Sequence, residues 1–229
     1  MTLNQEQVRQ ESPSLDADDF NASFDSNNRT LTSYYQLHSQ IYDWTRWSFL
    51  FGRDAIVKIA ADIAAKDHQP KRILEVGCGT GKNLRTLHRH FPHASLVGLD
   101  LSADMLNVAR KNMADVRIQV DLLQGAYGTI PQTEEYDLIL FSYALTMFNP
   151  GWDAAIEQSH RDLAPGGLIA VVDFHDSALK GFKRWMGVNH VRMDSHLPPK
   201  LEEHFAPQQK TVKQAYGGIW SYLLFVGQK

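Results

Sequence analysis

Three glycines alternate with other residues directly after a short apolar run, in the segment Glu-Val-Gly-Cys-Gly-Thr-Gly at residues 75–81. Because glycine has no Cβ, a ligand can approach this backbone closely, and the helix expected next offers unpaired amide groups. A dinucleotide fingerprint would need a glycine at position 82, which is Lys82, and Glu75 precedes the glycines. An acid there suits a positively charged ligand better than a pyrophosphate. The three glycines are Gly77, Gly79 and Gly81.

A second acid, Asp100, ends the next apolar run, residues 95–99. A carboxylate at the end of a second strand can accept hydrogen bonds from both hydroxyls of a ribose. S-adenosylmethionine has a ribose, an ammonium and a sulfonium but no phosphate. The two acids and the glycines between them therefore predict S-adenosylmethionine as the cofactor rather than NAD.

Composition limits the other classes of function. The 229 residues are 43% hydrophobic and 21% charged, which predicts one domain with attachments, and the net charge of -3 argues against a nucleic-acid partner. Neither His160 nor His175 has a companion at metal-ligand spacing, so no metal is expected. The single cysteine, Cys78, and the lack of a leader pattern or a long apolar run predict a cytoplasmic protein without a transmembrane segment.

Apolar runs and helical patterns alternate along the rest of the chain. This alternation predicts an α/β fold, a Rossmann-like doubly wound sheet with helices on both faces. A final β-rich segment, 211–226, is broken by Gly217 and Gly218 and predicts a hairpin that completes seven strands. The other predicted elements are strands 72–76, 95–100, 116–123, 136–142 and 167–174, and helices 81–90, 102–112 and 151–163.

Two regions flank this core. Residues 1–30 are polar and predict a flexible arm, and residues 31–229 predict a single domain. Within that domain we expect a helical cap at 31–66 (helices 31–48 and 53–66), a cofactor-binding core at 70–174, and a substrate-side insert with the C-terminal hairpin at 175–229.

The glycine segment, Asp100, the run Tyr-Asp-Leu-Ile-Leu at 136–140 and Leu-Ala-Pro-Gly-Gly at 163–167 together resemble class I S-adenosylmethionine-dependent methyltransferases. The resemblance covers about residues 70–174 and implies that family's seven-stranded fold. It departs from a common pattern at Gln124, where an acid usually contacts the adenine. The cofactor-binding residues that it implies are Tyr35, Glu75, Gly77, Cys78, Gly79, Gly81, Asn83, Asp100, Leu101, Met105, Gly125, Ala126, Phe141 and Ser142.

Three further segments, 35–53, 182–193 and 215–220, are similar to bacterial betaine-lipid N-methyltransferases. This similarity implies trimethylation of the amine of diacylglyceryl-homoserine. Phosphatidylethanolamine N-methyltransferases share features of the first segment. Methylation of a small molecule or a protein, and a binding module without catalysis, remain as alternatives.

A trimethylated amine is a permanent cation that aromatic faces can hold, and a substrate carboxylate suits the planar fork of arginine. The candidate substrate-binding residues are Arg46, Trp47, Arg53, Arg184, Arg192 and Trp220. The amine must also lose a proton before each transfer. The candidate catalytic residues are Tyr42, Tyr143 and His190.

Residues 177–196 form an amphipathic pattern. Leu179, Phe182, Trp185 and Met186 share one helical face, with lysines and an arginine close by. The pattern predicts either a helix lying in a lipid headgroup layer or a lid over the pocket. With a lipid headgroup as the substrate, we expect peripheral association with the inner membrane face.

Overall fold

The computed structural model describes residues 50–66, 69–129, 135–188 and 190–229. All of them belong to the unit Trp44–Lys229. The predicted arm, 1–30, and the first predicted cap helix, 31–48, lie outside the described residues.

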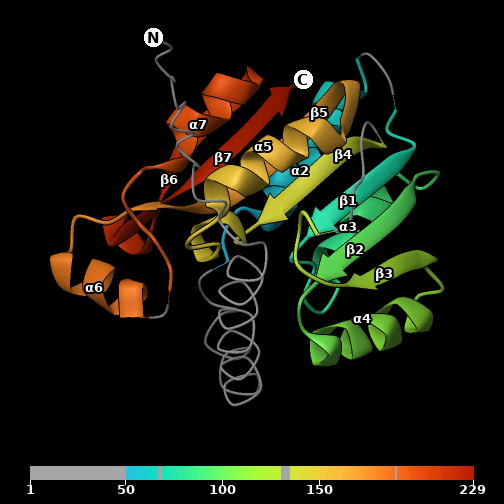
Figure 1. The fold of residues 1–229 in the computed structure, drawn as a ribbon, viewed down its shortest axis with the longest axis horizontal. Helices are drawn as coiled ribbons and strands as arrows, with labels where there is room; N and C mark the ends of the chain where they lie inside the picture. The colour runs from blue at the N-terminus through green and yellow to red at the C-terminus, as the bar shows by residue number, and fades with distance from the viewer. Residues whose placement is uncertain (1–49, 67–68, 130–134, 189) are drawn as a thin grey trace, which may run out of the picture. The chain divides into compact units, whose positions relative to one another are not determined.

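Seven strands form one mixed sheet in the order β3-β2-β1-β4-β5-β7-β6 (Figure 1). Strands β1 to β5 run parallel to one another, whereas β7 is antiparallel to both β5 and β6. The predicted Rossmann-like seven-stranded α/β fold and its terminal hairpin are thus confirmed. The strands are β1 Arg72–Val76, β2 Ser95–Asp100, β3 Val120–Gln124, β4 Tyr136–Ser142, β5 Leu163–Asp176, β6 Ala206–Ala215 and β7 Trp220–Gln228.

Helices cover both faces of this sheet. Ile56 of α2, Leu84 of α3 and Leu106 of α4 belong to the apolar core on one face. Ile156 of α5 and Leu201 of α7 belong to the core on the other face. The helices are α2 Arg53–Ala64, α3 Lys82–His90, α4 Ala103–Asp115, α5 Trp152–Asp162, α6 Lys180–Val188 and α7 Leu197–His204, with short 3-10 turns η2 Leu145–Met147 and η3 Tyr216–Gly218.

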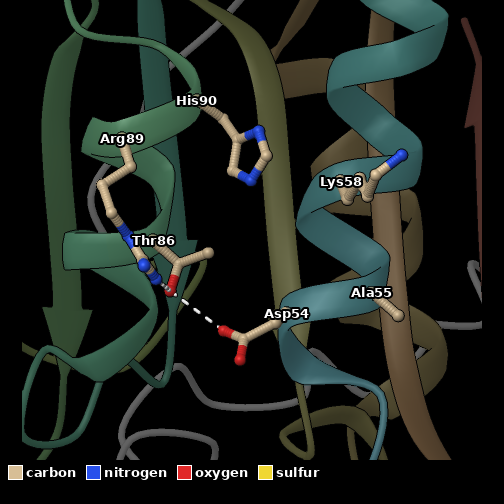
Figure 2. A pocket seen from close by; sticks show the side chains of 6 residues that line it. All are labelled: Asp54, Ala55, Lys58, Thr86, Arg89 and His90. Atoms are coloured by element: carbon tan, nitrogen blue, oxygen red, sulfur yellow. Dashed lines mark hydrogen bonds between the residues drawn. The ribbon is translucent and has the colours of Figure 1, made fainter.

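Polar side chains connect α2 with α3 (Figure 2). The Thr86 hydroxyl donates to Asp54 at 3.1 Å and accepts a hydrogen bond from Arg89 at 2.9 Å. These residues line a shallow hollow of about 370 Å³, together with Ala55, Lys58 and His90. The contacts fix the start of α2 against α3.

Several predicted boundaries are wrong. The strand predicted at 116–123 begins only at Val120, because α4 continues to Asp115 and Arg117 then adopts a left-handed backbone with φ 56°. The last central strand begins at Leu163, which pairs with Tyr136, and not at residue 167. Helix α7 was not predicted, since two prolines that are also typical of a turn follow its first residue, Leu197.

The strand order places the site. Strand β1 lies between β2 and β4 in the sheet. The connection from β1 to β2 therefore leads toward one side of the sheet, and the connection from β4 to β5 leads toward the other. Ligands of doubly wound sheets bind in the crevice beyond the carboxyl ends of such strands. Glu75 on β1, Asp100 on β2 and Ser142 on β4 all lie at that edge.

Within the described ranges, no helix combines the length and the apolar character needed to cross a bilayer. In the same part of the chain, no three His, Cys, Asp or Glu side chains gather as a metal site.

Candidate active site

The glycine loop after β1 has the backbone that its sequence demands. Gly77, Gly79 and Gly81 have φ angles of 72°, 54° and 77°, in the left-handed region where a side chain is strained. The N–H groups of Gly77 and Cys78 both donate to the carbonyl of Leu99, at 2.8 and 3.0 Å, which ties the loop to the end of β2. A Cβ on Gly79 would meet no described atom within 4 Å, so this glycine faces open space.

Asp100 is held against this loop. Its Oδ2 accepts a hydrogen bond from the N–H of Gly79 at 2.8 Å, and its Oδ1 accepts one from the N–H of Ser102 at 2.9 Å. Each carboxylate oxygen has further lone pairs, so both can accept a second hydrogen bond from a ribose hydroxyl. Ser102 also caps α4, because its hydroxyl accepts from the N–H of Met105.

Glu75 is completely buried beneath the loop. The amide of Asn83 donates to its Oε1 at 2.6 Å, and Arg53 Nε donates in turn to the Asn83 carbonyl oxygen at 2.9 Å. Its other oxygen, Oε2, is buried and makes no hydrogen bond within the described residues. Burial raises the pKa of Glu75 to about 8, although the charge of Arg53, the Asn83 amide and the backbone N–H of Leu84 act to lower it. One oxygen of this buried carboxyl therefore has no hydrogen-bond partner among the described residues.

The far side of the loop is apolar. Leu101 is 37% exposed immediately after Asp100, and Met105 on α4 is half-buried. Gly125 and Ala126, after β3, are also half-buried. Such a surface suits a flat heterocycle attached to the ribose.

The predicted methyl-transfer side follows β4. Phe141 is buried against Tyr127, and the buried Ser142 hydroxyl makes no hydrogen bond with the part of the chain described. Tyr143 is also buried, and its hydroxyl donates to the carbonyl of Phe51 at 2.8 Å. Burial raises the pKa of this hydroxyl, so the arrangement favours a link between β4 and the start of α2 over proton acceptance.

Sequence reasoning missed a buried pair beside this segment. The carboxylate of Asp173, at the end of β5, accepts hydrogen bonds from the Thr146 hydroxyl at 2.5 Å and from the Thr146 N–H at 3.1 Å. The N–H of Phe174 adds a third at 2.8 Å. Burial raises the pKa of Asp173 to about 6. The signal was present, since an acid that follows the apolar run 168–172 needs a specific partner.

The predicted substrate-binding residues differ in their contacts and in their exposure. Arg53 belongs to the Glu75 network, and Arg192 donates to Asp194 at 2.8 Å while its guanidinium lies 5.5 Å from the centre of the Trp152 ring. Arg184 is exposed on α6, and His190 is exposed with a left-handed backbone of φ 60°.

Trp220 is 1% exposed and contacts the rings of Phe51 and Phe174. The remaining site residues lie outside the described residues; they are Tyr35, Tyr42, Arg46 and Trp47.

The residues present fit S-adenosylmethionine. The buried Oε2 of Glu75 suits its ammonium, the space above Gly79 suits its amino-acid chain, and the Asp100 carboxylate suits its ribose. Leu101 offers an exposed apolar surface to the adenine.

Comparisons with known proteins agree with this assignment. The profile of the methyltransferase domain family matches residues 73–167, which include the glycine loop, Asp100 and β4. The trans-aconitate 2-methyltransferase of Methylobacterium nodulans is 31% identical over 131 residues, covering 56% of this chain and 49% of that protein. The demethylmenaquinone methyltransferase of Thermus thermophilus is 29% identical over 134 residues, covering 58% and 60%. This chain thus spans about half the length of such relatives.

A solved structure extends the similarity beyond the matched segment. The N-methyltransferase NodS from Bradyrhizobium japonicum, in complex with S-adenosyl-L-homocysteine, aligns with a TM-score of 0.61. The two chains are 20% identical, and the alignment covers 76% of this chain and 85% of NodS. At this identity the likeness concerns the fold.

Proposed function

Because this chain contains a class I S-adenosylmethionine-dependent methyltransferase domain, we propose that it methylates the amine of a membrane lipid, diacylglyceryl-homoserine, to the trimethylated betaine lipid. The observation that carries the lipid proposal is the surface of helix α6. Leu179 before the helix is 51% exposed, and Trp185 and Val188 on it are 53% and 72% exposed. The basic residues Lys180 and Arg184 lie exposed beside them.

Helix α6 is anchored by its other side. Met186 is buried in the domain core, and Phe182 packs partly against the same core. The apolar face predicted from the sequence is therefore only partly buried: Met186 and Phe182 contact the core, whereas Leu179 and Trp185 are exposed. An exposed tryptophan with aliphatic and basic neighbours suits the headgroup layer of a membrane, where an amphipathic ring and a cation are both favourable.

The position of α6 agrees with a substrate-side role for residues 175–229. The helix follows the carboxyl end of β5 directly, and β5 ends at the same edge of the sheet as the glycine loop. The segment after α6 returns to that edge, where the N–H of Arg192 donates to the carbonyl of Thr146 at 3.0 Å. A lipid amine presented along this segment would approach the side of the cofactor that follows β4.

Aromatic rings near the start of α2 support a methylated ammonium as the product. Phe51, which is 39% exposed, lies 5.3 Å from the Tyr216 ring and 6.2 Å from the Tyr222 ring, between centroids. Tyr216 is itself 47% exposed. Aromatic faces stabilise a quaternary ammonium through their quadrupoles.

For methyl transfer, the main task of the protein is to align the amine with the methyl group of the cofactor. When held by Glu75 and Asp100, S-adenosylmethionine would supply an activated methyl group for in-line transfer to the amine, with S-adenosylhomocysteine as the neutral thioether product. Each transfer to a primary or secondary amine also releases one proton. We propose His190, which is exposed, and Tyr42 as the proton acceptors. Arg184, which is also exposed, and Arg46 are proposed for the homoserine carboxylate.

Mass spectrometry of lipid extracts tests this proposal. Cells that make the full chain and are supplied with diacylglyceryl-homoserine should accumulate a lipid heavier by three methyl groups, and cells with the Asp100→Ala variant should not. If methylated phosphatidylethanolamine accumulates and the betaine lipid does not, phosphatidylethanolamine replaces diacylglyceryl-homoserine as the acceptor assigned to this protein. No methylated lipid, from a protein that binds S-adenosylhomocysteine, would overturn the lipid assignment.

A second candidate is methylation of a small soluble acid, and the named activity of the Methylobacterium nodulans relative favours it. Purified protein should then consume S-adenosylmethionine with trans-aconitate in the absence of any lipid. Such turnover without lipid methylation would favour this candidate over the betaine lipid.

A further inference from the structure

A chain of three side chains runs from the surface of the domain to the buried end of the candidate cofactor site. Arg53 Nε donates to Asn83 Oδ1 at 2.9 Å, and Asn83 Nδ2 donates to Glu75 Oε1 at 2.6 Å. The three residues come from α2, α3 and β1, and 30 residues separate Arg53 from Asn83 in the sequence. Tertiary packing alone brings them into line.

Each link has a defined direction. Arginine can only donate, so the amide of Asn83 presents its oxygen to Arg53 and its nitrogen to Glu75. Asn83 is 1% exposed, and Glu75 is fully buried. The amide therefore cannot flip without losing both bonds inside the protein, which makes it a rigid connection between Arg53 and Glu75.

The place of Arg53 is not explained by the stability of its own helix. It is the first residue of α2, directly after the N-cap Gly52. A cation at a helix N-terminus opposes the helix dipole, whereas Asp54 in the same turn is favourable there. The position does place the guanidinium within reach of Asn83 and lets its charge act on Glu75, whose pKa it lowers.

We propose that Asn83 and Arg53 are positioning residues for Glu75: they hold its Oε1, so that Oε2 is presented to the ammonium of the cofactor. Oε2 is buried and makes no hydrogen bond with any described residue, so the network leaves that one oxygen for a donor. The same network favours the charged carboxylate, because Arg53 and the Asn83 amide both oppose the effect of burial. The inference concerns the cofactor and holds for whichever acceptor the chain methylates.

The test compares two ligands that differ only in the amino-acid part. S-adenosylhomocysteine has the ammonium, and 5′-methylthioadenosine has the same thionucleoside without it. Isothermal titration of the full chain measures both dissociation constants. In Asn83→Ala we expect S-adenosylhomocysteine to bind about tenfold or more weakly, and 5′-methylthioadenosine to change by less than about twofold, because only the charged hydrogen bond is lost.

Arg53→Gln is the second variant. It removes the cation from a half-exposed position and leaves Asn83 and Glu75 in place. We expect the same selective loss, smaller than in Asn83→Ala, and Arg53→Lys should restore the charge but not the Nε donor. This variant keeps the proposal testable if Asn83→Ala fails to fold.

Asn112→Ala is the matched control. Its side-chain amide donates to the carbonyl of Thr80 at 2.9 Å and so supports the glycine loop from α4, with no contact to Glu75. Loss of this bond should weaken both ligands by a similar factor. If Asn83→Ala and Arg53→Gln also weaken both ligands equally, or neither, the positioning role is overturned.

Discussion

The carboxylate of Asp100 accepts a hydrogen bond from the backbone N–H of Gly79 at 2.8 Å. This bond joins the candidate ribose-binding acid on β2 to the middle of the loop that follows β1. The loop is also held at Leu99, whose carbonyl accepts from two successive N–H groups. The parts of the candidate site proposed for the amino-acid chain and the ribose thus have fixed positions relative to each other before a ligand arrives.

The open space at Gly79 predicts a selective effect of Gly79→Ala. The new methyl group meets no described protein atom within 4 Å, but it would project where the cofactor is expected. The left-handed φ of 54° should cost about 1 kcal/mol of folding free energy. We expect S-adenosylhomocysteine to bind at least about tenfold more weakly by isothermal titration, equal to about 1.4 kcal/mol.

Gly217→Ala provides the matched control for this strain. Gly217, in the β6–β7 turn, has φ 66°, and its added Cβ would likewise meet nothing within 4 Å. The thermal stability of the two variants should fall by similar amounts, while cofactor affinity falls only in Gly79→Ala. Unchanged affinity in Gly79→Ala would show that the ligand does not approach this glycine.

The buried carboxyl of Glu75 predicts how the ligand-free protein responds to pH. Its pKa is about 8 in the folded protein against an ordinary value of 4.5, so the folded state binds the proton more tightly. Glu75 therefore favours folding fully below pH 4.5, and this contribution is lost as the pH rises through 8. The Glu75→Gln variant has no titrating carboxyl at this position, so it lacks this contribution to the pH dependence.

Urea denaturation between pH 5 and 9 measures the difference. Relative to Glu75→Gln, the wild-type protein should lose roughly 1 to 4 kcal/mol of unfolding free energy over this range. Parallel curves for the two proteins would mean that Glu75 is ionised in the folded protein at all these pH values.

From the hydrogen bond of the Thr146 hydroxyl we expect Thr146→Val to lower the free energy of unfolding by an amount that depends on pH. The hydroxyl donates to Asp173, whose pKa of about 6 is raised from 3.8, so the carboxyl is neutral at pH 5 and charged at pH 8. The lost hydrogen bond stabilises the charged form of Asp173. Urea denaturation should therefore show that the variant loses about 1 to 3 kcal/mol of unfolding free energy at pH 8 and less at pH 5.

Thr129→Val is the control for this experiment. Its hydroxyl donates to the carbonyl of Ala126, which does not titrate, so its effect should be the same at both pH values. An equal loss for Thr146→Val at pH 5 and pH 8 would contradict the assigned protonation of Asp173.

The exposed Trp185 predicts binding to anionic vesicles. We expect the full chain to sediment with vesicles of phosphatidylcholine and phosphatidylglycerol more than with phosphatidylcholine alone, and Trp185→Ser to weaken this binding by about tenfold through lost apolar burial. Val108→Ser, at a site on α4 that is 43% exposed, should bind as the wild type does. Equal binding of all three proteins would exclude α6 as the membrane contact.

The alternation of apolar runs with helical patterns was sufficient to predict the sheet. Each central strand is a short apolar run whose side chains pack on both faces, and parallel strands of this kind need crossover helices, so few arrangements remain. Boundaries were less accurate where competing signals overlap. The sequence predicted a strand from residue 116, yet a turn at Arg117 follows α4 and the strand begins only at Val120.

By itself, the sequence determined the cofactor loop, because Gly77, Gly79 and Gly81 are close together in the chain and their lack of Cβ is a local property. The tertiary structure alone decided the alignment of Arg53 with Asn83 and Glu75, and of Thr146 with Asp173. These contacts join residues on different elements, and a hydrogen bond needs atoms placed to within a few tenths of an ångström. Spacing along a chain carries no such information, since packing of the helices on the sheet sets those distances.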